Sequence, residues 1–536
     1  MSRLFTLFFI FGFSILCSLD AQVVYQDINK TSVYNYLDEM ANLHKINTNP
    51  VIKPYSRQFI AEKLAELDTQ RIHLNKRQTA ELDFYLMDFN KELKGSFENK
   101  RFDVFYYSDS LFTFSLNGIL GGQGWKNENG FNYHRWYGAE AFAYAGEHLG
   151  VYASLRDNTE KVRLADTGLI SLRNGSKYRR GDYSEMRGGI TYAWNWGHVA
   201  LVKDYVHWGS SYRYPNIIGS KAPSFAQLKW NIKPADWFEF NYIHGWLVSE
   251  IVDSARSYTY NGVQRNVFHN KFIAANMFTF MPWKRLNLSV GNSVIYSDQV
   301  LNPAYFIPVF FYKSVDHTYN GNTNAAGQNS QMFFNISSRL IPKVHMYYSM
   351  FIDVMSFSSL FSEEEHANHW SMQGGVKVSN LLPNIALTVE YIRNNALVYK
   401  NDKHLLYSSN QYSLGHYLGD NAREIYIGLE FKPMKNLHFT SYFSMEQKGP
   451  DYPYTRSTGD VWGIPFMESI EWEQNQIGIQ FNYQILNDFF VFLEAEKRNV
   501  NRSRDIIARQ PDYDRYCSEF YQGDTFTWSF GINCGF

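Results

Sequence analysis

The sequence predicts a mostly β protein, namely an antiparallel transmembrane β-barrel of about 18 strands preceded by a three-helix periplasmic bundle. Three features predict it: the alternating C-terminus, an export-type N-terminus and an aromatic-rich but polar composition. Residues 525–536 place apolar side chains at every even position, from Phe526 to Phe536. Successive side chains of a strand point to opposite faces, so one face of this strand is wholly apolar. A strand that crosses a membrane barrel needs about 9–11 residues. We therefore interpret 525–536 as the closing strand.

Residues 1–21 are predicted to be a secretory signal. Arg3 supplies the positive start, the run from Leu4 to Leu16 is apolar, and Ala21 ends a small-residue cleavage site. A membrane anchor would need about 18 apolar residues, and this run is shorter. Cys17 suggests a lipoprotein, but Leu16 is too large for the usual lipid-attachment motif. We expect cleavage after Ala21 and export.

The composition narrows the class of protein. Aromatic residues make up 18% of the chain, with 39 Tyr and 42 Phe, although the mean hydropathy is −0.37. No later stretch is long and apolar enough for a spanning helix, which excludes a helical membrane protein. Alternating strands with aromatic girdles give this balance, and a secreted soluble β protein is the alternative. The net charge of −1 gives no argument for nucleic acid.

Residues 22–97 are predicted to form the helical bundle. Thr31 and Ser32 are candidate caps of a first helix, Ser56 opens a second, and a third follows Asn75. Each helix carries one apolar stripe and needs a partner. We expect a periplasmic bundle that packs on itself, with a protein-docking module as the alternative.

Residues 98–536 are predicted to form the barrel. Alternating apolar positions in 425–431 and 437–443 flank one short turn, and those in 477–485 and 489–495 flank another. Long polar connections separate such pairs, at 168–182, 254–269, 318–328 and 455–469. Short turns on one side and long loops on the other are typical of outer-membrane barrels, with the short turns periplasmic. The length fits 18 strands and nearly as well 16.

Two cysteines remain in the mature chain. Cys534 is expected near the periplasmic end of the last strand and Cys517 in the preceding outer loop. A disulfide needs Cα atoms within about 7 Å, and the strand holds the two residues farther apart. We predict no disulfide.

The sequence offers little catalytic chemistry. Asp204, His207 and Ser210 contain an acid, a base and a hydroxyl, but on one strand His207 faces away from the other two. Residues 363–366 with His369 are a weak cation candidate in a polar loop. We predict no enzymatic activity, no metal and no cofactor.

Several short patterns resemble the capsule assembly protein Wzi family. They stand, in order, at 33–37, 53–57, 60–64, 204–209, 220–225, 302–306 and 414–419. The resemblance covers essentially the whole mature chain. It implies a monomeric barrel of about 18 strands, helices at its periplasmic mouth and a role in attaching capsular polysaccharide to the cell surface.

Candidate glycan contacts follow from aromatic and basic residues. Aromatic faces stack on sugar rings, and amides and guanidinium groups hydrogen-bond hydroxyls. Trp208 and Tyr212 fall within one family-like block, and Lys177, Arg179 and Arg180 lie in a long outer loop. Membrane girdles and surface solvation use the same residue types.

Our functional hypothesis is a lectin-like barrel in the outer membrane of a Gram-negative bacterium, which binds surface polysaccharide. A porin or solute transporter is the alternative, and a barrel-embedded hydrolase is disfavoured. The expected partners are the polysaccharide, membrane lipids, lipopolysaccharide and, through Phe536, the barrel-insertion machinery.

Overall fold

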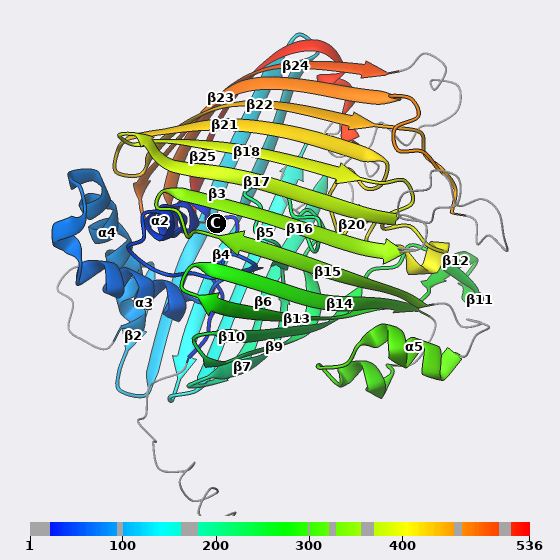
Figure 1. Ribbon diagram of the computed structural model, residues 1–536, viewed down its shortest axis with the longest axis horizontal. Helices are drawn as coiled ribbons and strands as arrows, with labels where there is room; N and C mark the ends of the chain where they lie inside the picture. Colours follow the sequence, from blue (N-terminus) through cyan, green and yellow to red (C-terminus); the bar gives the residue numbers. More distant parts are fainter. Residues whose placement is uncertain are drawn as a thin grey trace, which may run out of the picture.

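The protein folds into a closed antiparallel barrel of 18 strands with helices at one end (Figure 1). The computed structural model describes residues 22–93, 100–161, 181–297, 301–320, 328–354, 369–454, 464–502 and 516–535. The predicted signal therefore lies outside the described residues. The barrel strands are β3(Phe112–Asn127), β4(Gly130–Ala145), β5(Leu149–Glu160), β6(Asp182–Trp194), β7(Gly197–Asp204), β9(Phe225–Ala235), β10(Phe238–Leu247), β13(Lys271–Trp283), β14(Leu286–Ser297), β15(Gln328–Ser338), β16(Val344–Val354), β17(His369–Leu382), β18(Ile385–Asn394), β21(Ala422–Met434), β22(Leu437–Lys448), β23(Trp472–Leu486), β24(Phe489–Arg502) and β25(Gly523–Cys534).

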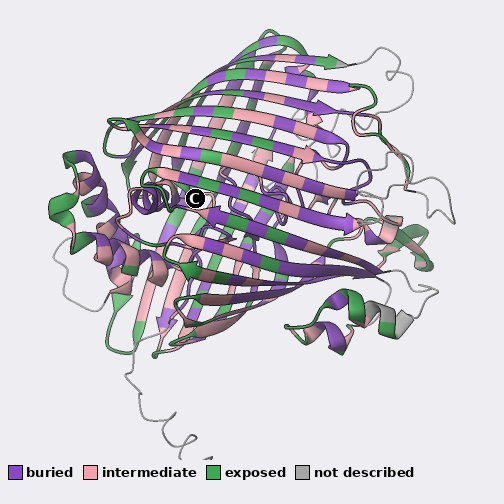
Figure 2. Ribbon diagram, in the orientation of Figure 1, coloured by how far each residue is buried: buried purple, intermediate pink, exposed green. Residues whose placement is uncertain are grey.

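The last strand closes the barrel, as predicted. β25 pairs with β24 along its length and with β3 from Trp528↔Lys126 to Cys534↔Leu120. Trp528, Phe530 and Ile532 are 59%, 54% and 44% exposed, whereas the residues between them face inward. Figure 2 shows the same alternation of exposed and buried positions along the other strands. The outer wall is thus a belt of apolar side chains, which suits a lipid environment.

A short strand continues the seam where β25 ends. β2(Phe105–Ser108) pairs with the start of β3, from Phe105↔Leu116 to Ser108↔Thr113. It lies on the same edge of β3 as β25, four residues beyond the last β25 pair at Leu120. Backbone groups of β3 at Thr113–Leu116, which β25 does not reach, therefore pair with β2, in the linker between the helices and the barrel.

Connections differ sharply between the two ends of the barrel. The turns after β4, β6, β9, β13, β15, β17, β21 and β23 are two to five residues long. At the other end most connections are long and carry β8(His207–Trp208), β11(Val252–Tyr260), β12(Val263–Phe268), η3(Pro303–Phe306), α5(Tyr312–Asn320), η5(Lys403–Leu405), β19(Ser408–Ser409), β20(Tyr412–Ser413) and η7(Glu519–Tyr521). The short-turn end is the periplasmic one.

Three helices precede the barrel: α2(Thr31–Asn42), α3(Arg57–Asp68) and α4(Lys76–Phe89), with short η1(Arg71–His73) and η2(Asn90–Glu92). Ser56 caps α3 by accepting from the Phe59 amide at 3.1 Å, and Asn75 with Gln78 forms a capping box on α4. The expected cap of α2 is wrong. Lys30 occupies its N-cap without a side-chain bond, and the Ser32 hydroxyl instead donates to Gln484 of β23 at 2.7 Å.

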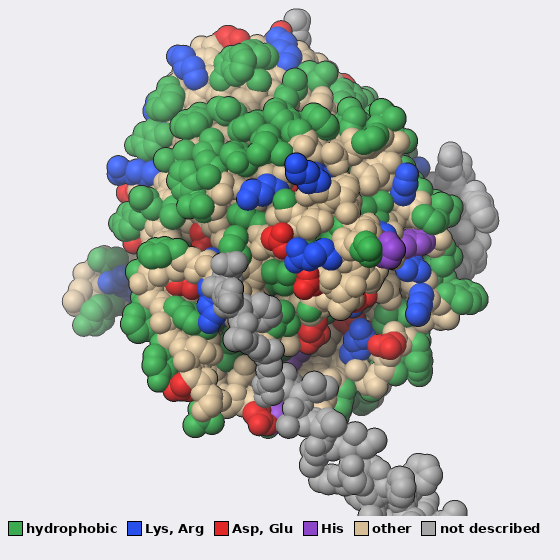
Figure 3. Space-filling view, turned by 90° about the vertical axis from the view of Figure 1, so that its left-hand side faces the viewer, with side chains coloured by type: hydrophobic (Ala, Val, Ile, Leu, Met, Phe, Trp, Pro, Cys, Tyr) green, Lys and Arg blue, Asp and Glu red, His purple; other side chains and the backbone are tan. Residues whose placement is uncertain are grey.

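The helices share a core and sit against the short turns. Leu37, Met40, Ile60, Leu64 and Leu82 are fully or almost fully buried in one cluster. Figure 3 looks onto this end of the molecule, where charged side chains of both signs lie among the hydrophobic ones. The predicted domain boundary at 97 falls outside the described residues, between η2 and β2.

Candidate functional site

Buried charges fasten the helices to the periplasmic mouth. Asp38 of α2 binds Arg339 at 2.7 Å, and Glu39 binds Lys432 at 3.0 Å. Arg101 of the linker binds Asp488 at 2.6 Å. A charge buried without a partner is costly, so these pairs fix where the helices dock.

The Glu39 carboxylate of this contact pairs with two cations, Lys432 and Arg77. Burial alone would raise its pKa, but the cations of Lys432 and Arg77 lower the pKa of Glu39 to about 2. Arg77 also pairs with Glu81 and donates to Asn384 in the β17–β18 turn at 3.0 Å. The helical unit and the barrel therefore share one charge network.

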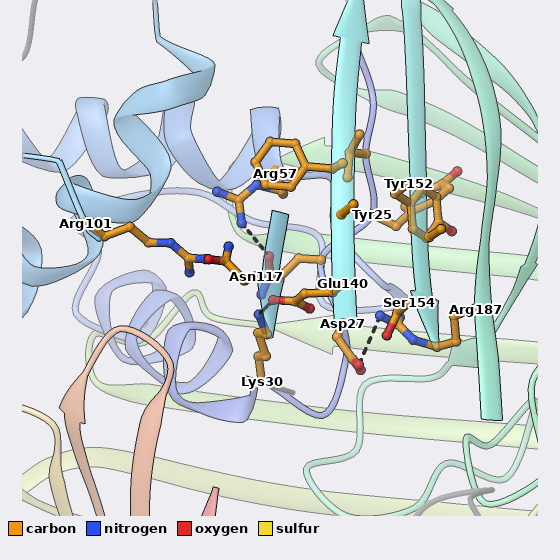
Figure 4. Close-up of a pocket in the computed structure, with 15 residues that line it drawn as sticks. Tyr25, Asp27, Lys30, Arg57, Arg101, Asn117, Glu140, Tyr152, Ser154 and Arg187 are labelled. Carbon is orange, nitrogen blue, oxygen red and sulfur yellow. Dashed lines mark hydrogen bonds and ion pairs between the residues drawn. The ribbon is translucent and has the colours of Figure 1, made fainter. Parts of the chain in front are cut away.

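A second, smaller contact region surrounds a cavity of about 40 Å³ at the same end (Figure 4). Lys30 binds Glu140 at 2.8 Å, and Arg187 binds Asp27 at 3.0 Å. Both pairs join the N-terminal stretch to the barrel wall. A cavity of this size holds water but not a sugar ring.

The N-terminal chain then enters the lumen. β1(Ile52–Lys53) pairs with β8, with Ile52 opposite Trp208 and Lys53 opposite His207. The Gly209 amide donates to the Val51 carbonyl at 2.8 Å, and Val51 is fully buried. Thus β1, which precedes the barrel in the chain, pairs with β8, which belongs to the β7–β9 connection folded into the lumen.

Two connections from the outer end complete this filling. The Tyr399 hydroxyl, in the β18–β21 connection, donates to the Asn216 carbonyl of the β7–β9 connection at 2.7 Å. The Gly219 amide donates to the Leu414 carbonyl at 2.6 Å. We call residues 46–56, 205–224 and 395–421 the luminal plug. Its apolar core includes Val206, Trp208, Ile217, Ile218, Val398, Tyr407 and Leu414. This core packs on inward side chains of β9, β10 and β13 to β16, among them Ile273, Met277, Phe333 and Phe351.

The opposite side of the plug is polar. Arg213 binds Glu424 at 2.6 Å, and His416 lies 3.3 Å from the same carboxylate. The cavity beside them is only about 10 Å³. These groups join the plug to β21.

The structure describes two of the five predicted site residues, Trp208 and Tyr212. Trp208 is 1% exposed and packs edge-on against Phe333, with ring centroids 6.1 Å apart. Tyr212 is half-buried, and its hydroxyl lies 2.6 Å from Nδ1 of His345. Both belong to the plug. Lys177, Arg179 and Arg180 lie outside the described residues.

The other candidates also have structural partners. Asp204 binds Arg187 at 3.0 Å and accepts from Tyr152 at 2.6 Å, while His207 pairs in β8. His369 is buried at the start of β17, and residues 363–366 lie outside the described residues. Among the described residues no acidic, histidine and cysteine cluster could hold a metal, and Cys517 and Cys534 form no disulfide with each other. The described helices include none long and apolar enough to cross a bilayer.

An exposed aromatic hairpin stands at the outer end. β11 and β12 are joined by Asn261-Gly262, both with positive φ, and Tyr258 lies opposite Arg265. Tyr258 and Tyr260 share one face and are 58% and 60% exposed. A long polar connection was expected at 254–269, without strands. The Asn-Gly pair between alternating residues was the missed hairpin signal.

These features define an outer-membrane β-barrel with a plugged lumen. In fold it is similar to Wzi of Escherichia coli, described as an outer-membrane protein involved in group 1 capsule assembly and a carbohydrate-binding β-barrel. The TM-score is 0.56 at 14% identity, over 96% of this chain and 100% of that one.

Outer-membrane barrels named Occ also align. OccK3 of Pseudomonas aeruginosa has a TM-score of 0.42 at 8% identity, over 78% of this chain and 95% of that one. OccAB2 of Acinetobacter baumannii has a TM-score of 0.44 at 7% identity, over 78% and 97%. No family model and no curated protein matches the sequence.

Proposed function

We propose that this outer-membrane barrel binds a surface polysaccharide and holds it at the cell surface, without enzymatic turnover. The luminal plug carries the proposal. A barrel whose lumen is packed by its own chain is suited to binding at its outer end rather than to free passage of solutes. The ligand class is taken from the carbohydrate binding described for the E. coli barrel, and we extend it to this chain.

The β11–β12 hairpin is the part of the described outer end best suited to a glycan. Tyr258 and Tyr260 present two ring faces on one side, and Arg265 stands opposite Tyr258 on the neighbouring strand. Ring faces stack on the C–H surface of sugars, and a guanidinium group hydrogen-bonds hydroxyls or carboxylates. We add these three residues to the earlier candidates Lys177, Arg179 and Arg180.

Glycan retention by the full chain tests the proposal. The double variant Tyr258→Ala/Tyr260→Ala is expected to lose roughly tenfold in apparent affinity for the host's surface polysaccharide, because each aromatic contact contributes about 0.5–1.5 kcal/mol. Thr259→Ala, on the opposite face of the same strand, is the matched control. Absence of polysaccharide binding by the wild-type protein would refute the proposal.

Planar-bilayer conductance separates the proposal from the porin alternative. The full chain is expected to give no steady single-channel current, because the plug fills the lumen. A stable conductance that a small solute blocks would assign the barrel to transport instead.

A further inference from the structure

One sector of the barrel's outer wall carries polar side chains that are completely covered. On β13 and β14 the outward positions include Phe280 and Val290, which are 40% and 36% exposed. Asn276 and Asn292 oppose each other on that same outward face, yet they are 0% and 8% exposed. Tyr242 of β10, opposite Asn276, is 1% exposed. Something other than lipid covers this sector.

The cover is the chain between β14 and β15. Nδ2 of Asn276 donates to the carbonyls of Pro308 and Phe310, both at 2.9 Å. The Tyr312 amide donates to Oδ1 of Asn292 at 2.9 Å, and the Tyr242 hydroxyl donates to the Tyr305 carbonyl at 2.8 Å. We call residues 301–312 the wall segment. Its backbone is bound to the outside of the barrel at specific side chains.

Aromatic packing reinforces these hydrogen bonds. Phe306 stacks on His244 of β10, with ring centroids 4.1 Å apart and planes at 22°. Tyr305 and Tyr312 are fully buried against Phe272, Val294 and Tyr296. Figure 1 places α5, which continues from the wall segment, outside the barrel, where it contacts β14 and β15. The wall segment is thus a docked layer on the wall.

The surface that this layer turns outward is apolar. Ile307, Val309, Phe310 and Phe311 are 40%, 60%, 38% and 43% exposed. Their polar backbone groups at Pro308 and Phe310 are bonded inward to Asn276. Irregular backbone survives at membrane depth only where its polar groups are satisfied by protein, and side chains of the barrel satisfy the carbonyls of Tyr305, Pro308 and Phe310 and the Tyr312 amide.

The register places the segment at membrane depth. A strand tilted by about 40° rises about 2.6 Å per residue, so Asn292 lies about 16 Å above Leu286 at the periplasmic end of β14. The apolar band of an outer-membrane barrel is about 25 Å tall. Asn292, and the carbonyls docked beside it, therefore lie within the outer half of that band.

We propose that the wall segment is an intramembrane element whose residues Ile307, Val309, Phe310 and Phe311 contact the acyl chains of outer-leaflet lipids. It replaces lipid against the polar sector of β10, β13 and β14 and presents a new apolar surface to the bilayer. The inference concerns the membrane side of the barrel and does not depend on the polysaccharide proposal.

Nitroxide accessibility in lipid vesicles tests this assignment. The label is placed by Val309→Cys in a full chain that carries Cys517→Ala and Cys534→Ala. Val290→Cys on the outer wall is the lipid-facing control, and Tyr258→Cys on the outer hairpin is the water-facing control. Oxygen concentrates in the bilayer and a water-soluble nickel chelate stays outside it. The Val309 label is expected to match the Val290 label, with collision by oxygen several-fold above that by nickel.

Two other results would overturn the proposal. Collision by nickel as strong as at Tyr258 would place the segment above the membrane. Low collision by both reagents would mean that protein covers Val309, and in vesicles of the purified chain that protein is a second copy. A second variant guards against altered docking: Val309→Arg should lower the folded yield in vesicles several-fold, whereas Thr318→Arg on exposed α5 should not.

Discussion

At the scale of single residues, buried charges decide how the helical unit meets the barrel. Glu39 contacts Lys432 of β21, and Asp38 contacts Arg339 after β15. Removing one partner of a buried pair costs about 3–5 kcal/mol, because the other charge stays buried. Stable docking of the helices therefore depends on every buried charge keeping its partner, more than on the number of pairs.

The lowered pKa of Glu39 predicts an acid-sensitive contact. Its pKa falls from 4.5 to about 2 on folding, so the ionised form stabilises the folded state fully above pH 4.5. This stabilisation, about 3 kcal/mol, is lost as the pH falls from 4.5 towards 2. Amide exchange of α2, corrected for intrinsic rates, should report the loss. Glu39→Gln should lower protection at neutral pH and flatten the acid dependence, whereas Glu66→Gln in an exposed pair should change neither.

Trp208 is predicted to act through packing in the plug. Trp208→Ala should lower the local stability of the plug by about 3–5 kcal/mol, since it removes a fully buried ring. Hydrogen exchange of residues 205–224 should accelerate correspondingly. Trp237→Ala, at an exposed short turn, is the control. Unchanged protection in the Trp208 variant would contradict the assignment.

At the scale of elements, the two ends of the chain share the closure of the barrel. β25 covers the edge of β3 down to Leu120, and β2 covers the same edge from Leu116. Neither element alone pairs the whole edge of β3. Closure thus couples the N-terminal linker to the C-terminal strand.

The outward face of β25 predicts depth-dependent sensitivity to charge. Phe530→Arg should destabilise the barrel in bilayers by about 2–4 kcal/mol, because Phe530 faces outward in the interior of β25, where we expect the middle of the apolar band. Phe526→Arg, on the same face but nearer the outer end, should cost about 0–1 kcal/mol. Urea unfolding in vesicles measures both. Equal losses of stability in the two variants would show that the cost of a charge on this face does not depend on its depth in the bilayer.

At the scale of the whole molecule, the lumen is filled from both ends. Residues 46–56 enter from the periplasmic side, while 205–224 and 395–421 fold in from the outer side. Because the three segments pack on one core, residues 46–56 supply only one part of the plug.

This arrangement predicts how conductance responds to truncation. Removing residues 22–93 alone should leave the outer connections in place and give at most a small current. Replacing 205–224 by a short Gly-Ser linker in the same chain should produce a large, steady current. Planar-bilayer recording compares the two variants with the full chain. A large current from the first variant would show that residues 22–93 alone block the lumen.

Local sequence patterns are sufficient to define the architecture of the barrel wall. Alternating apolar residues predict which side chains face outward, because the backbone fixes the strand period at two residues. This pattern is present in 525–536 and in the hairpins around 432–436 and 487–488. The lengths of the turns placed the periplasmic end, and Ser56 and Asn75 marked two helix starts through local capping bonds. All of these signals act over a few residues.

The segment that covers each face of the wall depends on long-range contacts, which local patterns do not encode. Trp208, a candidate glycan contact, lies in the plug, and residues 302–306, one of the family-like patterns, lie on the outer wall. In both cases the partners, such as Phe333 and His244, are far away in the sequence. Alternation assigns a residue to a face, but the burial of that face depends on which distant segment folds onto it.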